Sequence, residues 1–338
     1  MFKKALLTAL LPGLIWAAPA ASDDAGPGDP FFGQQWGLSR IRAPEVWPEV
    51  TGSGVTIAVV DSGVDLSHPD LAPNVDVERD ADFVDGKPDT DGAQDTTGHG
   101  THVAGIAAAA TNNGIGVAGV APHARILPVR VLGSDNDRTA RIAAGIRYAA
   151  DRGAQVINLS LSYSPPGHVD TITGSMRPVH EAIAYALSKG SVVVASAGND
   201  TLPACAEPAA VDGVLCVGAL DRSDRPAYYT NFESRRSKRY LVAPGGDQTI
   251  SCANDILSTY LRGADRVCAP ADGYESLAGT SMAAAFVSGT AALLSEKGLE
   301  APEIVECLLG SADDLGPPGR DPIYGHGRLD AAAAVTSC

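Results

Sequence analysis

The apolar residues of this chain fall into short, uninterrupted runs that lie between longer segments with helical spacing. A run without polar alternation is typical of a strand that is buried on both faces, as in a parallel sheet. The sequence therefore predicts buried strands at Val55–Val60, Arg125–Val131, Val156–Leu161, Val192–Ala195 and Val214–Val217.

Alanine-rich segments between and after these runs predict helices. Thr139–Arg152 is followed by Gly153 and Val179–Lys189 by Gly190, and glycine is favoured just beyond a helix end. Ser281–Lys297 is a third, longer segment of this kind. Strands that alternate with helices predict an α/β fold with a mainly parallel central sheet and helices on both faces.

Two polar side chains follow closely on the ends of predicted strands. Asp61 comes after Val55–Val60, and Asn199 comes shortly after Val192–Ala195. Sites in parallel α/β sheets lie beyond the carboxyl ends of the strands, so both residues are candidates for a functional site.

The first residues read as an export signal. Lys3 and Lys4 precede an apolar stretch, Ala5–Ala18, that is too short to span a bilayer, and Ala18-Pro-Ala20 is a plausible cleavage site. An amphipathic first helix of the fold is the alternative. We expect residues 1–20 to be a signal peptide, 21–33 a short acidic linker and 34–338 one domain, secreted to the extracellular space or the periplasm.

The formal net charge of −15 argues against nucleic acid and anionic membrane surfaces as partners. It suits a soluble exported protein, which we expect to be a monomer. Acidic side chains also raise affinity for calcium, although solubility alone would account for the charge.

Six cysteines fit an oxidising compartment, although free buried thiols are the alternative. They allow 15 pairings, among which sequence alone does not choose. Spacing favours neighbours, namely Cys205 with Cys216, Cys252 with Cys268 and Cys307 with Cys338.

Three motifs contain the residue types of a nucleophilic triad. They are Val-Val-Asp61-Ser-Gly, Gly-His99-Gly-Thr-His-Val-Ala-Gly and Gly-Thr-Ser281-Met-Ala. A serine hydroxyl needs a base to take its proton, and an imidazole oriented by a carboxylate is such a base. The order Asp, His, Ser is the order found in subtilisin.

From about Asp29 to about Val335 the chain resembles the subtilisin-family (subtilase) serine proteases, of the thermitase-like, calcium-binding kind. The resemblance implies a subtilisin-like three-layer fold and hydrolysis of peptide bonds in proteins through an acyl-enzyme intermediate. It makes Ser281 the nucleophile, His99 the general base and Asp61 the residue that orients it, and it makes the second histidine, His102, structural.

The resemblance also implies an oxyanion hole and a substrate strand. Asn199 and the N–H of Ser281 are the expected oxyanion donors. The residues expected to bind substrate are Leu159, Ser160, Leu161, Ser162, Ala197 and Gly198.

One structural Ca²⁺ is implied as well. Its ligands would be two carboxylates, an amide oxygen and three carbonyls, which is the hard oxygen set that calcium prefers. They come from Asp29, Asp70, Asn113, Ala110, Ile115 and Val117. A second acidic group is either another calcium site or a solvated loop, and it comprises Asp82, Asp85, Asp89 and Asp91.

The chain departs from the family pattern in a few places. After Ser281 the usual proline and histidine are missing, and Phe286 stands in the histidine's place. Ser162 and Tyr163 replace two glycines, which predicts a narrower first pocket. The insertion at about Ser164–Arg177 either lines the cleft or is an inert loop.

Charges near the pocket leave its preference open. Glu207, expected near the pocket floor, and Asp200 either favour a basic residue before the cut or are solvated. An esterase is a rival function, but the Gly-x-Ser-x-Gly motif is absent. An inactive binding protein is another, although all four catalytic residues are present.

Overall fold

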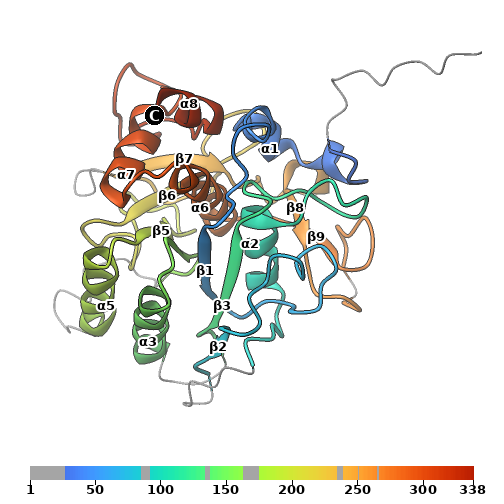
Figure 1. Ribbon diagram of the computed structural model, residues 1–338. Coiled ribbons are helices and arrows are strands. Elements are labelled where there is room, and N and C mark those ends of the chain that lie inside the picture. Colours follow the sequence, from blue (N-terminus) through green and yellow to red (C-terminus); the bar gives the residue numbers. More distant parts are fainter. Residues whose placement is uncertain are drawn as a thin grey trace, which may run out of the picture.

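A mainly parallel sheet forms the centre of the molecule (Figure 1). The structure is a computed structural model, and it describes residues 27–84, 92–133, 138–162, 175–233, 239–249, 251–264 and 266–338. Within these residues the sheet has seven strands, in the order β2-β3-β1-β4-β5-β6-β7, and every neighbouring pair is parallel. The strands are β1 (Thr56–Asp61), β2 (Ala81–Asp82), β3 (Arg125–Arg130), β4 (Val156–Leu159), β5 (Val192–Ser196), β6 (Leu215–Leu220) and β7 (Tyr240–Pro244).

The five expected strands are all present, with shifted ends. The largest difference is in β6, which was expected to end at Val217 and continues to Leu220, whereas β4 was expected to continue to Leu161 and ends at Leu159. Leu159 pairs with Ala195, the last register position that β4 shares with β5. Ser160 and Leu161 have left the sheet and lie beyond its carboxyl edge.

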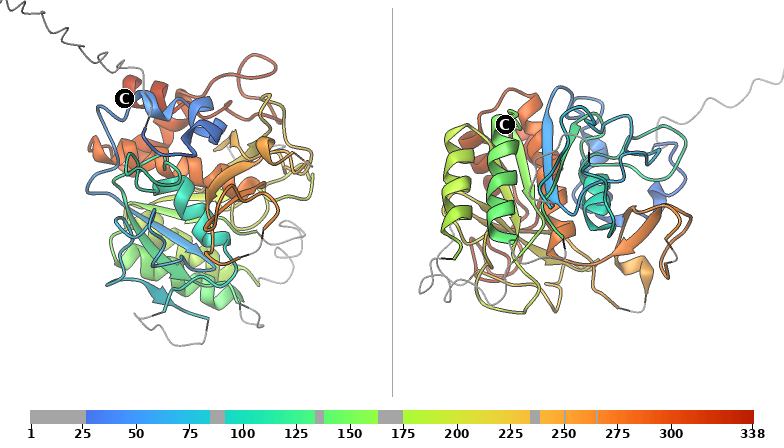
Figure 2. Two further views of the ribbon diagram at one scale, coloured as in Figure 1. Left: turned by 90° about the vertical axis from the view of Figure 1, so that its right-hand side faces the viewer. Right: turned by 90° about the horizontal axis from the view of Figure 1, so that it is seen from below.

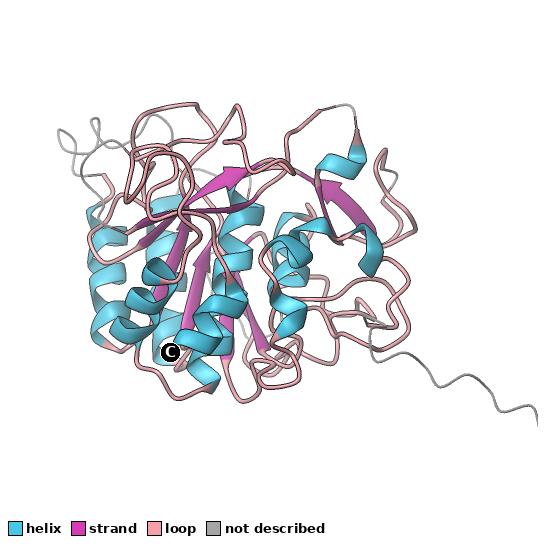
Figure 3. Ribbon diagram, turned by 90° about the horizontal axis from the view of Figure 1, so that it is seen from above, coloured by secondary structure: helices cyan, strands magenta, loops and turns pink. Residues whose placement is uncertain are grey.

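Helices cover both faces of the sheet, as expected (Figures 2 and 3). On one face, α3 and α5 pack side by side; on the other, α2 packs against α6. Successive strand residues enter the two cores alternately: Ile57 and Val59 belong to the core under α2 and α6, whereas Ala58 and Val60 belong to the core under α3 and α5. These helices are α2 (His99–Ala108), α3 (Arg138–Asp151), α5 (Arg177–Ser188) and α6 (Thr280–Glu296).

Helix α2 ends at Ala108, because Ala109 is extended, with φ −59° and ψ 141°. The chain turns here so that the N–H of Ala110 can bond the Asp70 carbonyl at 2.8 Å. The predicted glycine ends of α3 and α5 are confirmed, since Gly153 and Gly190 have positive φ.

The remaining elements surround this unit. An antiparallel hairpin, β8 (Ile256–Thr259) and β9 (Tyr274–Leu277), packs beside α2 and leads into α6. The other helices are α1 (Trp36–Arg40), α7 (Ala301–Gly310) and α8 (Ala331–Ser337), with 3-10 turns at Phe32–Gln34, Ala43–Glu45 and Cys252–Asn254. In the part of the chain that the structure describes, no helix has both the length and the apolar composition needed to cross a bilayer.

The three neighbour disulfides are confirmed: Cys205–Cys216, Cys252–Cys268 and Cys307–Cys338. The last one joins α7 to the end of the chain after α8.

Candidate active site

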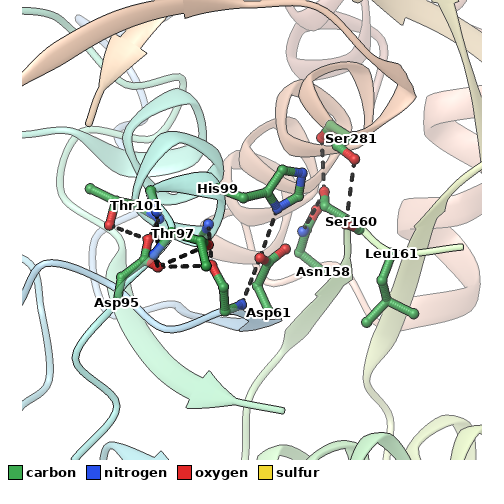
Figure 4. Close-up of polar contacts among 12 residues, drawn as sticks. Asp61, Asp95, Thr97, His99, Thr101, Asn158, Ser160, Leu161 and Ser281 are labelled. Atoms are coloured by element: carbon green, nitrogen blue, oxygen red, sulfur yellow. Dashed lines mark hydrogen bonds and ion pairs between the residues drawn. The ribbon is translucent and has the colours of Figure 1, made fainter. Parts of the chain in front are cut away.

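The site lies at the carboxyl edge of the sheet, where Asp61 ends β1, His99 begins α2 and Ser281 is the second residue of α6 (Figure 4). The fold therefore brings the three motif residues to one place. Helices α2 and α6 pack against each other, and this contact sets the histidine and the serine on neighbouring helix starts.

Asp61 is completely buried and bonds the imidazole of His99. The Nδ1–Oδ1 distance is 2.7 Å, and the same oxygen accepts the Ser62 N–H at 2.7 Å. With Nδ1–H donated to the carboxylate, Nε2 carries the lone pair that can accept a proton. Gly100 is required at this contact, because a Cβ there would lie 2.1 Å from the Gly63 carbonyl oxygen.

The Asp61 carboxylate sets the proton affinity of His99. Burial alone would lower the pKa of His99, but the charge and hydrogen bond of Asp61, with a contribution from Asp95, outweigh it and raise that pKa above its ordinary value. The protonated form of the His99 imidazole is thus stabilised by the Asp61 carboxylate.

Asp95, which the sequence analysis did not identify, holds the start of α2. Its Oδ1 accepts the Gly98 N–H at 3.0 Å and the Thr97 N–H at 2.9 Å. Its Oδ2 accepts the N–H and the hydroxyl of Thr101 at 3.0 and 2.7 Å. Since the first N–H groups of a helix lack partners within it, this buried carboxylate fixes the turn that carries His99.

His102 is buried and bonds the backbone of β9. Its Nε2 donates to the Glu275 carbonyl at 3.0 Å, and burial lowers its pKa to about 3. It therefore stays neutral, in keeping with the structural role expected for it.

The hydroxyl of Ser281 donates a long hydrogen bond of 3.4 Å to the Ser160 carbonyl. Ser160 returns a stronger one, from its own hydroxyl to the Ser281 carbonyl at 2.8 Å. Asn158 of β4 donates to that hydroxyl at 2.9 Å. The expected substrate strand is thus tied to the backbone of Ser281, and the weak bond on the Ser281 hydroxyl is easily exchanged for another partner.

Asn199 lies beyond the end of β5 with its amide oriented by α6. Its Oδ1 accepts the N–H and the hydroxyl of Thr280 at 3.0 and 2.9 Å. This fixes the carbonyl end of the amide and directs the Nδ2 donors away from Thr280. A Cβ on Gly279 would lie 3.5 Å from that Nδ2, so the amide group lies beside the residue that precedes α6.

The expected calcium ligands come together although they are distant in sequence. Asp29 accepts the N–H groups of Asn112 and Asn113 at 2.7 and 3.0 Å. Asp70 accepts the side-chain amide of Asn113 at 2.7 Å and the Val117 N–H at 2.8 Å. Burial raises the pKa of Asp70 to about 6, and the nearby Asp29 charge adds to the rise.

Further features fit a hard cation here. Among the described residues, no hydrogen bond reaches the carbonyl oxygens of Ala110, Ile115 or Val117. The same part of the chain contains no cluster of three histidine, cysteine, aspartate or glutamate side chains suited to a metal. A site at this position would depend on carbonyl oxygens as well as on its two carboxylates, as calcium allows, whereas the Asn113 amide oxygen accepts the Ile115 N–H at 2.9 Å.

Other expected residues are differently placed. The Glu207 carboxylate is buried and bonds His180 of α5 at 2.9 Å, so it is not a free acidic group of the first pocket, whereas Asp200 is exposed. Asp82 pairs with Arg130 at 2.6 Å. The rest of that acidic group (Asp85, Asp89 and Asp91), Tyr163, most of the Ser164–Arg177 insertion and the signal segment lie outside the described residues.

The sequence matches the model of one protein family. The Subtilase family model matches residues 52–327, and the chain belongs to that family of serine endopeptidases. It is similar to thermitase from Thermoactinomyces vulgaris, with 40% identity over 311 residues that cover 91% of this chain and 99% of thermitase. The halolysin-like extracellular serine protease Nep from Natrialba magadii is 35% identical over 318 residues, covering 92% of this chain and 53% of that protein.

Solved structures of proteases superpose on this fold. A protease from Pseudoalteromonas arctica PAMC 21717 superposes with a TM-score of 0.79 at 34% identity, covering 93% of this chain and 99% of that one. A lanthipeptide protease superposes with a TM-score of 0.79 at 28% identity, covering 92% of this chain and 98% of that one.

Proposed function

We propose that this subtilase is a secreted endopeptidase that cleaves proteins with Asp61, His99 and Ser281 as its triad. The observation that carries the assignment is the 2.7 Å bond between buried Asp61 and His99, beside the helix start that bears Ser281. The Ser281 oxygen attacks the substrate carbonyl while its proton passes to Nε2 of His99. The imidazolium then gives that proton to the leaving amine, and water releases the acyl group by the same route.

The oxyanion of the tetrahedral intermediate is bound by Asn199 and by the Ser281 N–H. Ser281 is near the start of α6, where backbone N–H groups have no acceptor within the helix. The positive end of the helix dipole adds to the stabilisation. Substrate lies along Leu159–Ser162 on one side and Ala197–Gly198 on the other.

One structural calcium ion is held by Asp29, Asp70, Asn113 and the three carbonyl oxygens named above. When bound, it supplies positive charge between two buried carboxylates that otherwise repel each other. The ion takes no part in the proton transfers, which occur between Ser281 and His99.

The chain organisation follows from the same reasoning. Residues 1–20 act as a signal peptide and 21–33 as an acidic linker whose last part, from Asp29 on, packs onto the peptidase domain. Residues 34–338 form that domain, which acts as a secreted monomer. One relative, Nep from Natrialba magadii, is an extracellular serine protease, which supports export. Disulfides in the described chain support it as well, since they persist in oxidising compartments.

Replacement of the nucleophile tests the assignment. Ser281→Ala should remove nearly all casein hydrolysis while leaving thermal unfolding unchanged, and an organophosphonate should label the wild-type serine but not the variant. Retention of more than about a tenth of the wild-type activity would contradict the triad. Labelling of Ser281 together with ester cleavage but no casein cleavage would point to an esterase.

A further inference from the structure

A buried asparagine, Asn231, forms hydrogen bonds with the backbone on both sides of Asn199. It lies between β6 and β7, is 0% exposed, and is not part of the assigned catalytic set. Its Nδ2 donates to the Ala197 carbonyl at 3.0 Å, and its own N–H donates to the Gly198 carbonyl at 2.9 Å. These two carbonyls immediately precede Asn199 in the chain.

On the other side of Asn199, the same side chain holds the turn that follows. Its Oδ1 accepts the Asp200 N–H at 3.0 Å and the Leu202 N–H at 2.9 Å. One residue therefore clamps the backbone before and after Asn199. Within the described chain, the side-chain hydrogen bonds of Asn199 itself come from Thr280 alone, so its position also depends on how its backbone is held.

The turn is one that the chain would not adopt without support. Thr201 has φ +57°, a left-handed conformation that is costly for a β-branched residue and persists where surrounding bonds impose it. The two N–H groups that flank Thr201 are those bound by Asn231. Gly198 shows the same fit, since it has φ +103° and a Cβ on it would lie 2.4 Å from the Asn231 Nδ2.

We propose that Asn231 is a positioning residue for the oxyanion donor, acting through Asn199 rather than on the substrate. This rests on the proposed role of Asn199 in the oxyanion hole. Loss of the Asn231 hydrogen bonds leaves the turn without support. The Nδ2 of Asn199 is then no longer held at a fixed position relative to the oxyanion. Because preorganised donors act mainly in the transition state, the loss appears in kcat more than in KM.

A double-mutant cycle tests this proposal. The variants are Asn231→Ser, whose short hydroxyl reaches neither end of the loop, Asn199→Ala, and the two combined. Turnover is measured with a peptide p-nitroanilide and divided by the concentration of active sites. That concentration comes from a separate sample, in which Ser281 is titrated completely with an organophosphonate. Unfolded protein then does not contribute.

Asn199→Ala should lower kcat by about 10²–10³-fold, as expected for one oxyanion-hole donor. Asn231→Ser should lower kcat by about tenfold in the wild-type background and by less than twofold when Asn199 is already absent. Equal losses in both backgrounds, or no loss in either, would overturn the positioning role. If Asn199→Ala leaves kcat unchanged, the proposed oxyanion assignment is what fails.

A matched control separates stability from positioning. Asn74 is also buried, and its Nδ2 bonds the carbonyls of Ala108 and Pro122 at 2.9 and 2.7 Å, away from Asn199. Asn74→Ser should lower the unfolding midpoint but leave turnover per active site unchanged. Should Asn231→Ser fail to fold, Asn231→Gln, which keeps the amide but displaces it by one methylene, takes its place in the cycle.

Discussion

Asp95→Asn changes one buried oxygen to an NH₂ group and should destabilise the fold by about 3 kcal/mol. If the amide oxygen takes the Oδ1 position, it keeps the bonds from Ser62, Thr97 and Gly98. The new NH₂ then faces the Thr101 N–H, which loses its acceptor. An unpaired buried N–H costs about 1–3 kcal/mol, and the lost negative charge at the start of α2 adds about 0.3–1 kcal/mol.

The measurement is urea unfolding in the Ser281→Ala background, where self-digestion cannot distort the curve. Asp272→Asn is the control, because Asp272 is exposed and accepts one backbone bond, from Gly263 at 2.6 Å. The control should lose less than about 1 kcal/mol, the usual range for a surface substitution. An equally small loss for Asp95→Asn would refute the idea that this carboxylate fixes the turn before His99.

Three further predictions follow from the site and its supports. Because the pKa of His99 is raised and kcat/KM requires its neutral imidazole, kcat/KM should rise with pH around a midpoint that lies above the ordinary histidine value of about 6.5. A pH profile with a lower midpoint would contradict the Asp61 pairing. The ion pair itself stabilises the fold below that ordinary pKa and is lost as pH rises through the raised one. EDTA should lower the midpoint of thermal unfolding by about 5 °C if calcium was present at a hundredfold excess over its Kd. Asp70→Asn should make the protein insensitive to EDTA. Equal midpoints with EDTA and with millimolar calcium would exclude the site. Replacing Cys307 and Cys338 by serine opens a separation of 31 residues and should reduce stability by about 3.7 kcal/mol in the loop-entropy model, as measured by urea unfolding; an unchanged midpoint would show that the bond constrains little.

The parts of the fold that the sequence predicted are those whose signals are local. Apolar runs such as Val55–Val60 are buried on both sides whatever packs against them, so the run alone identified β1. The glycines after α3 and α5 identify helix ends because their positive φ is a property of the residue itself. The proposed triad could be predicted because each of its members stands beside small residues in a recognisable order.

The parts that were missed depend on partners far along the chain. β8 mixes apolar residues with Ser258 and Thr259, and these side chains are buried because they bond carbonyls of α2, more than 150 residues away in sequence. Asp95 and Asn231 look like ordinary loop residues, and their roles exist only once the backbone segments they bond have met. The capping box of α7, with Glu300 and Glu303, was a local signal that the sequence analysis passed over.

The burial of α6 has a consequence for the order of events in the life of the enzyme. Every residue from Thr280 to Leu294 is buried, and the helix packs against five strands of the sheet as well as α2, α7 and α8. The serine therefore reaches its place only when most of the domain has closed around it, and backbone amides in this helix should exchange with deuterium only through global unfolding. A partly folded chain can then be cleaved as a substrate but cannot itself cleave peptide bonds. Proteolytic activity therefore begins only when folding is complete.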